Sequence, residues 1–145
     1  MGLEQIYTEV VSEHAREPEN KHDLDCATCS LKGHNPSCGD EIVLHLDVEN
    51  GIVKDASFTG IGCAISQAST DIMIDLIRGK QVAEARDLAR KFIGMIKGDI
   101  TDESELEPLD EALALKDIRH MPARVKCAVL AWHTLDMALD DKGKK

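Results

Sequence analysis

The sequence predicts an α+β fold in which a small antiparallel sheet of three strands packs against about five helices. Two alternating apolar runs, residues 41–48 and 52–59, predict strands joined by a hairpin at Asn50-Gly51. On either side of the hairpin, apolar residues recur with the period of amphipathic helices. A chain of 145 residues has the size of one domain, so we expect residues 1–145 to form a single domain.

The N-terminal part of the chain is predicted to be a helix followed by a loop. Residues 3–16 place their apolar side chains on one stripe, as an amphipathic helix does. Residues 17–37 contain Pro18, Gly33 and Pro36 among polar residues. These turn-forming residues predict that the segment is mostly loop.

The hairpin also predicts which residues lie opposite each other. Asn50 and Gly51 suit a type I′ turn, which requires a positive φ at both central positions. Glu49 would then pair with Ile52, and the numbers of paired residues would sum to 101. If that register continued to the open end of the hairpin, Cys38 would lie opposite Cys63, unless the glycines before Cys63 introduce a bulge.

The second half of the chain is predicted to be helical. Apolar stripes indicate helices at residues 64–78 and 81–97, and Pro122 suits the first turn of a last helix that ends near residue 140. The acidic segment 99–110 is predicted to be a loop or a frayed helix, with a short helix extending up to Leu115.

Composition argues against several classes of partner. The formal net charge is −10, from 27 acidic and 17 basic residues, so nucleic acid and anionic membranes are poor partners. A cation or a protein with a basic patch is a better match. No apolar run approaches the length of a membrane span, and the N-terminus has no signal-peptide pattern. We therefore expect a cytoplasmic protein.

Five cysteines are the main chemical feature of the sequence. An odd number of cysteines in a reducing compartment is not expected to form a disulfide framework. They could instead be inert buried thiols, metal ligands or a reactive thiol. These cysteines are Cys26, Cys29, Cys38, Cys63 and Cys127.

Three of the cysteines and one carboxylate occupy positions that suit metal binding. Asp40 follows Cys38 by two residues and so shares a face with it if a strand begins there. Cys63 lies at the start of the helix predicted at residues 64–78, where the helix N-terminus favours a thiolate. Cys127 lies early in the last helix, just after the basic residues Arg124 and Lys126, whose positive charge also favours a thiolate.

Three thiolates and one carboxylate make a four-coordinate set that zinc or an iron–sulfur cluster accepts. The harder carboxylate ligand would hold such a site less firmly than a fourth thiolate, so it suggests a site meant to open. For Cys127 alone, inert packing on an apolar helix is the competing interpretation.

The chain resembles the SufU proteins, the SUF-system members of the IscU/NifU-like iron–sulfur assembly family. The resemblance rests on three segments, which are "NPSCGDEI", "GIGCAISQAS" and "PARVKCAVLAW". It covers nearly the whole chain, and residues 99–117 look like the extra stretch that separates SufU from the IscU branch. It implies a compact α+β fold with a site made by Cys38, Asp40, Cys63 and Cys127.

The resemblance also implies a function. Proteins of the SufU type hold zinc, accept persulfide sulfur from a SufS-type cysteine desulfurase and pass it to downstream SUF scaffold proteins or apo iron–sulfur proteins. Cys38 matches the sulfur acceptor, and Arg124 matches a supporting position. The protein would then have a sulfurtransferase-type activity. The first alternative is a scaffold that assembles and transfers a labile [2Fe–2S] cluster or binds iron, and the second is a structural zinc domain.

Cys26 and Cys29 depart from the SufU pattern and keep three interpretations open. With His22 or His34 they could form a second metal half-site. They could also form a dithiol that takes sulfur from Cys38, or they could be a chemically quiet loop feature. The remaining histidines that we considered, His45, His120 and His133, are predicted not to be ligands.

Overall fold

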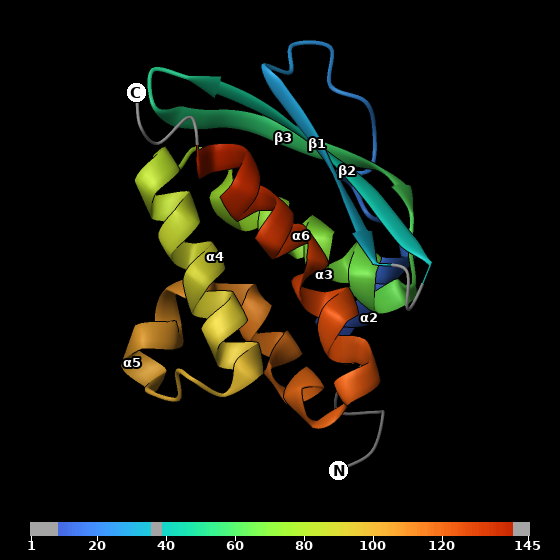
Figure 1. The fold of residues 1–145 in the computed structure, drawn as a ribbon, viewed down its shortest axis with the longest axis vertical. Helices are drawn as coiled ribbons and strands as arrows, with labels where there is room; N and C mark the ends of the chain where they lie inside the picture. Colours follow the sequence, from blue (N-terminus) through green and yellow to red (C-terminus); the bar gives the residue numbers. More distant parts are fainter. Residues whose placement is uncertain (1–8, 36–38, 141–145) are drawn as a thin grey trace.

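The computed structural model describes residues 9–35 and 39–140. Its three strands form an antiparallel sheet in the order β1-β2-β3, and the helices pack below one face of that sheet (Figure 1). The predicted α+β class is therefore confirmed. The elements in chain order are α2 (Glu9–Arg16), β1 (Cys29–Asn35), β2 (Asp40–Glu49), β3 (Ile52–Ile61), α3 (Ala64–Ile77), α4 (Val82–Lys97), α5 (Glu103–Leu106), η1 (Glu107–His120) and α6 (Pro122–Asp140).

The hairpin between β2 and β3 has the predicted turn. Asn50 and Gly51 have φ angles of 54° and 75°, both positive as a type I′ turn requires. Glu49 pairs with Ile52, as predicted. The strands 41–48 and 52–59, the helices 64–78 and 81–97, and the last helix from Pro122 are also found close to their predicted bounds.

The predicted register fails a short distance from the turn. Val48 pairs with Val53, but Asp47 pairs with Asp55, so Lys54 is an extra residue in β3. Beyond this bulge the paired numbers sum to 102, as in the last pair, Glu41 with Ile61. A single extra residue shifts every later pair, and here the bulge lies near the turn and not at the glycines before Cys63.

The predicted pairing of Cys38 with Cys63 required the first register to hold to the open end of the hairpin, and this condition is not met. β3 ends at Ile61, and Cys63 is instead the residue that caps α3. Cys38 lies outside the described residues.

The prediction that residues 17–37 are mostly loop missed strand β1. Gly33 was interpreted as a loop residue, yet it lies within β1 and pairs with Ile42. A Cβ atom added to Gly33 would lie 2.2 Å from Oγ1 of Thr134 in α6. Gly33 therefore allows β1 to approach helix α6 closely and does not end the strand.

The core lies between the sheet and helices α3 and α6, with α4 and η1 packed around them. Trp132 in α6 stacks on Phe92 in α4, with ring centroids 4.1 Å apart. The indole Nε1 of Trp132 donates a hydrogen bond of 2.8 Å to Oγ of Ser69, which donates to the carbonyl of Ala128. This buried network joins α3 to α6 with its polar groups satisfied.

The acidic segment is more ordered than the sequence predicted. Residues 103–120 form α5 and η1, interrupted at Asp110, whose φ is 50°. Leu109, Ala112, Leu115 and Ile118 are buried against the core. Burial of these apolar side chains among the acidic residues accounts for the additional order.

Helix α2 is joined to the rest of the fold by His14. Its Nδ1 contacts Oδ2 of Asp71 in α3, and its Nε2 lies 3.0 Å from Oε2 of Glu111 in η1. Asp71 is buried, and its Oδ1 also accepts hydrogen bonds from the backbone and side chain of Asn20. This cluster ties three separate segments together.

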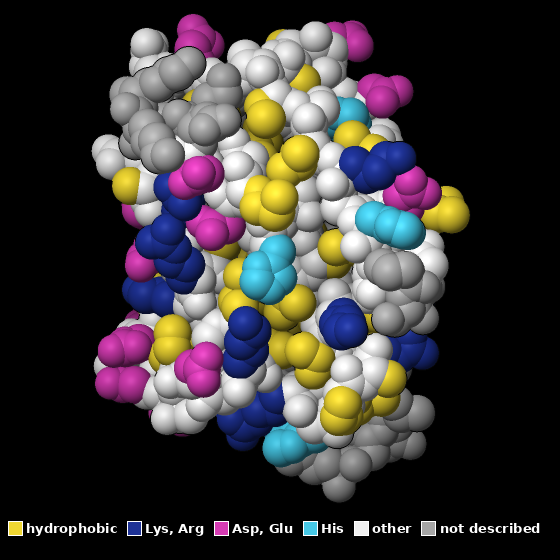
Figure 2. Space-filling view, in the orientation of Figure 1, with side chains coloured by type: hydrophobic (Ala, Val, Ile, Leu, Met, Phe, Trp, Pro, Cys, Tyr) yellow, Lys and Arg dark blue, Asp and Glu magenta, His cyan; other side chains and the backbone are white. Residues whose placement is uncertain are grey.

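The face of the molecule shown in Figure 2, which includes α4 and α6, carries hydrophobic side chains along its middle and Lys and Arg side chains on both sides. No helix in the described part of the chain is long and apolar enough to span a membrane.

Candidate metal centre

Asp40 is a fully buried carboxylate at the first position of β2. Its Oδ1 accepts a hydrogen bond of 2.8 Å from the backbone N–H of Cys63. Its Oδ2 is also buried and has no hydrogen-bond partner among the residues that the structure describes. A buried carboxylate oxygen without a partner costs stability, so Oδ2 is suited to bind a group that the protein alone does not supply.

Cys63 is the N-cap residue of α3. Its backbone is extended, with φ −73° and ψ 170°, and its Sγ accepts from the backbone N–H of Ser66 at 3.4 Å. The thiol therefore takes the place that Ser, Thr or Asp usually occupies at a helix N-cap. As predicted, Cys63 lies at the start of this helix, beside the positive end of the helix dipole.

Cys127 reaches the same place from the second turn of α6. It is buried, and the side-chain amide of Asn35, at the end of β1, lies 4.0 Å from its Sγ. Asn35 is paired with Asp40 across the sheet. The end of β1, the start of β2, the N-terminus of α3 and an early turn of α6 thus converge on one point.

The three groups form a donor set. One ligand atom from each of Asp40, Cys63 and Cys127 lies within 4.8 Å of the others. Two sulfurs and one carboxylate oxygen suit zinc, and the partnerless Oδ2 of Asp40 shows that this oxygen is available as a ligand. The residues present therefore fit a bound metal ion.

Glycines make room for this arrangement. Gly39, directly before Asp40, has φ +70°, which favours glycine at this tight bend. A Cβ atom on Gly62 would lie 2.8 Å from Oγ of Ser66 and 3.2 Å from Oδ1 of Asp40. The absence of a side chain at Gly62 therefore keeps the space beside the carboxylate open.

Comparison with known families identifies the chain. Its sequence matches the NifU-like N terminal domain family over residues 6–145. The chain belongs to this family. The match spans the whole fold and all four residues that were predicted to form the site.

Individual members of the NifU-like family resemble the chain over almost their full length. A Thermotoga maritima protein named iron–sulfur cluster assembly scaffold protein IscU is 43% identical over 139 residues, which are 96% of each chain. A Bacillus subtilis protein named zinc-dependent sulfurtransferase SufU is 37% identical over 135 residues, covering 93% of this chain and 90% of that protein.

A crystal structure from Fervidobacterium islandicum AW-1 agrees with the fold. That protein is assigned as an iron–sulfur cluster assembly scaffold protein for the SUF system. It superposes with a TM-score of 0.85 and 36% identity, over 96% of this chain and 100% of its own.

The structure describes three of the four predicted ligands of this NifU-like domain. It brings Asp40, Cys63 and Cys127 together. Cys38, two residues before Asp40 in the sequence, lies outside the described residues, so its part in the site stays a prediction. His34 and His120 are not in this donor group.

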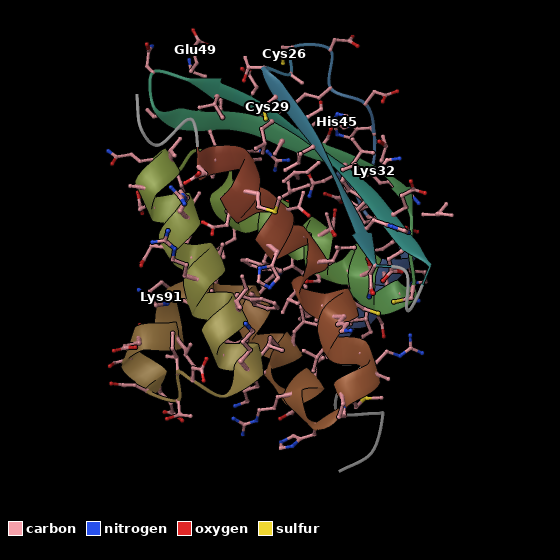
Figure 3. The ribbon with its side chains drawn as sticks, in the orientation of Figure 1. Cys26, Cys29, Lys32, His45, Glu49 and Lys91 are labelled. Carbon is pink, nitrogen blue, oxygen red and sulfur yellow. The ribbon has the colours of Figure 1, made fainter. Side chains whose placement is uncertain are left out.

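Cys26 and Cys29 lie at the other end of the sheet. Cys29 pairs with Leu46, whereas Asn35, six residues later in the same strand, pairs with Asp40. At about 3.3 Å per residue, Cys29 is roughly 20 Å along the strand from the metal centre. Figure 3 shows Cys26 and Cys29 close to the hairpin end marked by Glu49.

The three interpretations of this cysteine pair can now be compared. In the described part of the chain, neither thiol belongs to a group of three or more potential metal ligands. The distance along β1 also argues against direct transfer of sulfur from the centre to Cys29. Cys26 is exposed and Cys29 is half-buried, so of the three interpretations a chemically quiet pair fits the structure best, although Cys29 lies in strand β1 and not in a loop.

Two neighbours of the centre were missed by the sequence reasoning. Asn35 is brought there by β1, a strand that the pattern did not reveal. Ser66 lies one helical turn after Cys63, and that spacing was a usable signal because N-cap residues contact the third residue of their helix.

Proposed function

We propose that this protein acts in iron–sulfur cluster assembly as a zinc-dependent sulfur acceptor, which takes persulfide sulfur from a SufS-type cysteine desulfurase. The observation that carries the proposal is the buried, partnerless Oδ2 of Asp40 beside the thiols of Cys63 and Cys127. Support also comes from the Bacillus subtilis relative, which is named a zinc-dependent sulfurtransferase.

The ligand set of the proposed centre is Cys38, Asp40, Cys63 and Cys127. A zinc ion bound there would keep the thiols deprotonated and protect them from oxidation. The chain supports this with its own groups, since the Ser66 N–H donates to Sγ of Cys63 and the Cys63 N–H orients the Asp40 carboxylate. The carboxylate is the ligand expected to exchange most readily, because it is harder than the thiolates.

Cys38 is the proposed acceptor. Its thiolate attacks the terminal sulfur of the persulfide on the desulfurase, and the sulfur–sulfur bond of that persulfide breaks. The desulfurase cysteine leaves as a thiolate, and Cys38 carries the transferred sulfur as a persulfide. Nothing is oxidised or reduced overall, so the step needs no redox cofactor. A reducing cytosolic compartment belongs to the proposal, because all these thiols must stay reduced.

A second candidate function is a scaffold that assembles a [2Fe–2S] cluster as cargo and passes it to apo iron–sulfur proteins. The Thermotoga maritima and Fervidobacterium islandicum relatives carry the scaffold name. The donor set also suits this cargo, because iron–sulfur clusters are held by cysteine thiolates.

Protein purified without oxygen separates these functions. We expect a colourless protein that contains zinc and gains one sulfur atom, measured by mass spectrometry, when incubated with a SufS-type desulfurase and cysteine. Brown protein with charge-transfer absorption that reactivates an apo-ferredoxin would favour the scaffold. Stable zinc with neither activity would overturn both in favour of a structural zinc domain.

Cysteine variants test which residue accepts the sulfur from the desulfurase. Cys38→Ala is expected to abolish sulfur transfer to the protein. The double variant Cys26→Ala/Cys29→Ala is the matched control, because these thiols lie at the far end of β1, and it should accept sulfur as the wild type does. Labelling that persists in Cys38→Ala would rule out Cys38 as the acceptor.

A further inference from the structure

Ser66 is the second buried group at the metal centre that lacks a partner. Among the described residues, three buried side chains have a polar atom without a hydrogen bond, and these atoms are Oδ2 of Asp40, Oγ of Ser57 and Oγ of Ser66. Ser57 lies within β3 opposite His45, away from the centre. Oδ2 of Asp40 and Oγ of Ser66, by contrast, both lie at the metal centre. A purely structural role for Ser66 does not explain this position.

The position of the Ser66 hydroxyl follows from its neighbours. Ser66 is 1% exposed, and its backbone N–H donates to Sγ of Cys63. Its Oγ and the Oδ1 atom of Asp40 both lie close to the point where a Cβ of Gly62 would be, at 2.8 Å and 3.2 Å. The hydroxyl and the carboxylate therefore share the space that Gly62 leaves open.

The rest of the helix does not use this hydroxyl. Thr70 donates to the backbone carbonyl of Ser66 and so does not use its side chain. A serine at this position could donate to the carbonyl of Gly62, but that carbonyl accepts a hydrogen bond from the side-chain amide of Gln67. By contrast, Ser69 in the same helix has its hydroxyl fully engaged with Ala128 and Trp132.

A free hydroxyl donor beside a carboxylate is a complementary pair. Hydrogen bonds from O–H to a carboxylate are among the stronger ones in proteins, and outer groups of this kind orient metal ligands. Rotation about the Cα–Cβ bond moves the Ser66 hydroxyl between three staggered positions, so it can turn toward the carboxylate.

We propose that Ser66 is a positioning residue of the metal centre, whose hydroxyl donates a hydrogen bond to the Asp40 carboxylate and orients Oδ2 toward the bound ion. The Cys63 N–H and the Ser66 hydroxyl then hold the carboxylate from two sides. This inference rests on the metal centre proposed above. It assigns Ser66 no contact with the ion and no part in the sulfur-transfer chemistry.

The test compares Ser66→Ala with Ser69→Ala, two identical changes three residues apart in α3. Zinc affinity is measured by competition with a chromophoric chelator, cobalt(II) is added as a spectroscopic probe, and the metal-free proteins are unfolded in urea. We expect Ser66→Ala to bind zinc about tenfold more weakly and to shift the cobalt absorption bands. Its urea midpoint without metal should equal or exceed that of the wild type, because a partnerless buried hydroxyl is removed.

Ser69→Ala should show the opposite pattern, with a lower urea midpoint and unchanged zinc affinity and cobalt bands, because it loses hydrogen bonds away from the centre. If Ser66→Ala matches the wild type in affinity and in the cobalt spectrum, the role of Ser66 is overturned while the centre stands. If the wild type itself binds neither zinc nor cobalt at Asp40 and the two thiols, the proposed centre fails first.

Discussion

The backbone N–H of Cys63 donates a hydrogen bond of 2.8 Å to Oδ1 of Asp40, and this bond links the first residue of β2 to the cap of α3. It leaves the second oxygen of the same buried carboxylate without a partner, next to the thiols of Cys63 and Cys127. One carboxylate oxygen of Asp40 thus joins β2 to α3, and the other oxygen is available to bind a ligand.

Replacement of Asp40 by asparagine tests this division. Asp40→Asn keeps an oxygen that can accept from Cys63, but an amide nitrogen takes the place of Oδ2 and cannot bind zinc. We expect the zinc affinity to fall by about tenfold or more, as measured by chelator competition. Asp47→Asn, in the same strand but outside the donor group, is the control and should bind as the wild type does. Equal affinities in Asp40→Asn and the wild type would remove Asp40 from the centre.

The stability of the fold should depend on pH through His14. Burial alone lowers the pKa of His14, but its hydrogen bonds to Asp71 and Glu111 and their charges outweigh this and raise it above 6.5. A third carboxylate, that of Asp75, lies within 4.8 Å of His14 and Asp71. Protonation therefore favours the folded state, and the stabilisation is fully present below about pH 6.5 and lost as the pH rises through the folded pKa.

Urea unfolding of the wild type and His14→Gln over a pH series checks this linkage. The difference in unfolding free energy between the two proteins should be largest in mildly acidic solution and should shrink toward alkaline pH. A difference that stays constant or grows with rising pH would contradict the assignment to His14.

Gly60 should be among the glycines least tolerant of substitution. Its φ is +112°, and an added Cβ would lie 2.0 Å from the backbone oxygen of Glu41, across the sheet from it. Gly60→Ala should therefore reduce the free energy of unfolding by on the order of 3 kcal/mol or more. Gly79→Ala is the matched control, because Gly79 has φ +84° with open space around it and should cost only about 1–2 kcal/mol. Similar losses for both variants would show that the contact with Glu41 is unimportant.

Cys26 should react slowly for a surface thiol. A hydrogen bond with Asp47, together with smaller effects of burial and charge, raises the pKa of Cys26 and disfavours its thiolate. Asp47→Asn should shift the pH profile of Cys26 alkylation, followed by peptide mass spectrometry, toward lower pH. Glu49→Gln removes an acid from the same strand without this contact and should leave the profile in place. An unchanged profile in Asp47→Asn would assign the raised pKa to another cause.

Much of the fold could be predicted from local patterns alone. The Asn50-Gly51 turn, the strands beside it and the helices α3, α4 and α6 depend on interactions between residues that are close in the chain, and periodicity reports these directly. The residue types of the candidate centre were also visible, because Asp40, Cys63 and Cys127 stand at the start of a strand or near the start of a helix.

What the sequence by itself determined, therefore, was the set of elements and the chemistry available at their ends. Only the tertiary structure decided that Gly33 belongs to a strand packed on α6, that Lys54 shifts the register, and that Ser66 lies beside Asp40 without a partner. These features depend on contacts between segments distant in the chain, and one inserted residue or one missing side chain is enough to change them. The local pattern of apolar residues does not depend on such contacts and so cannot predict them.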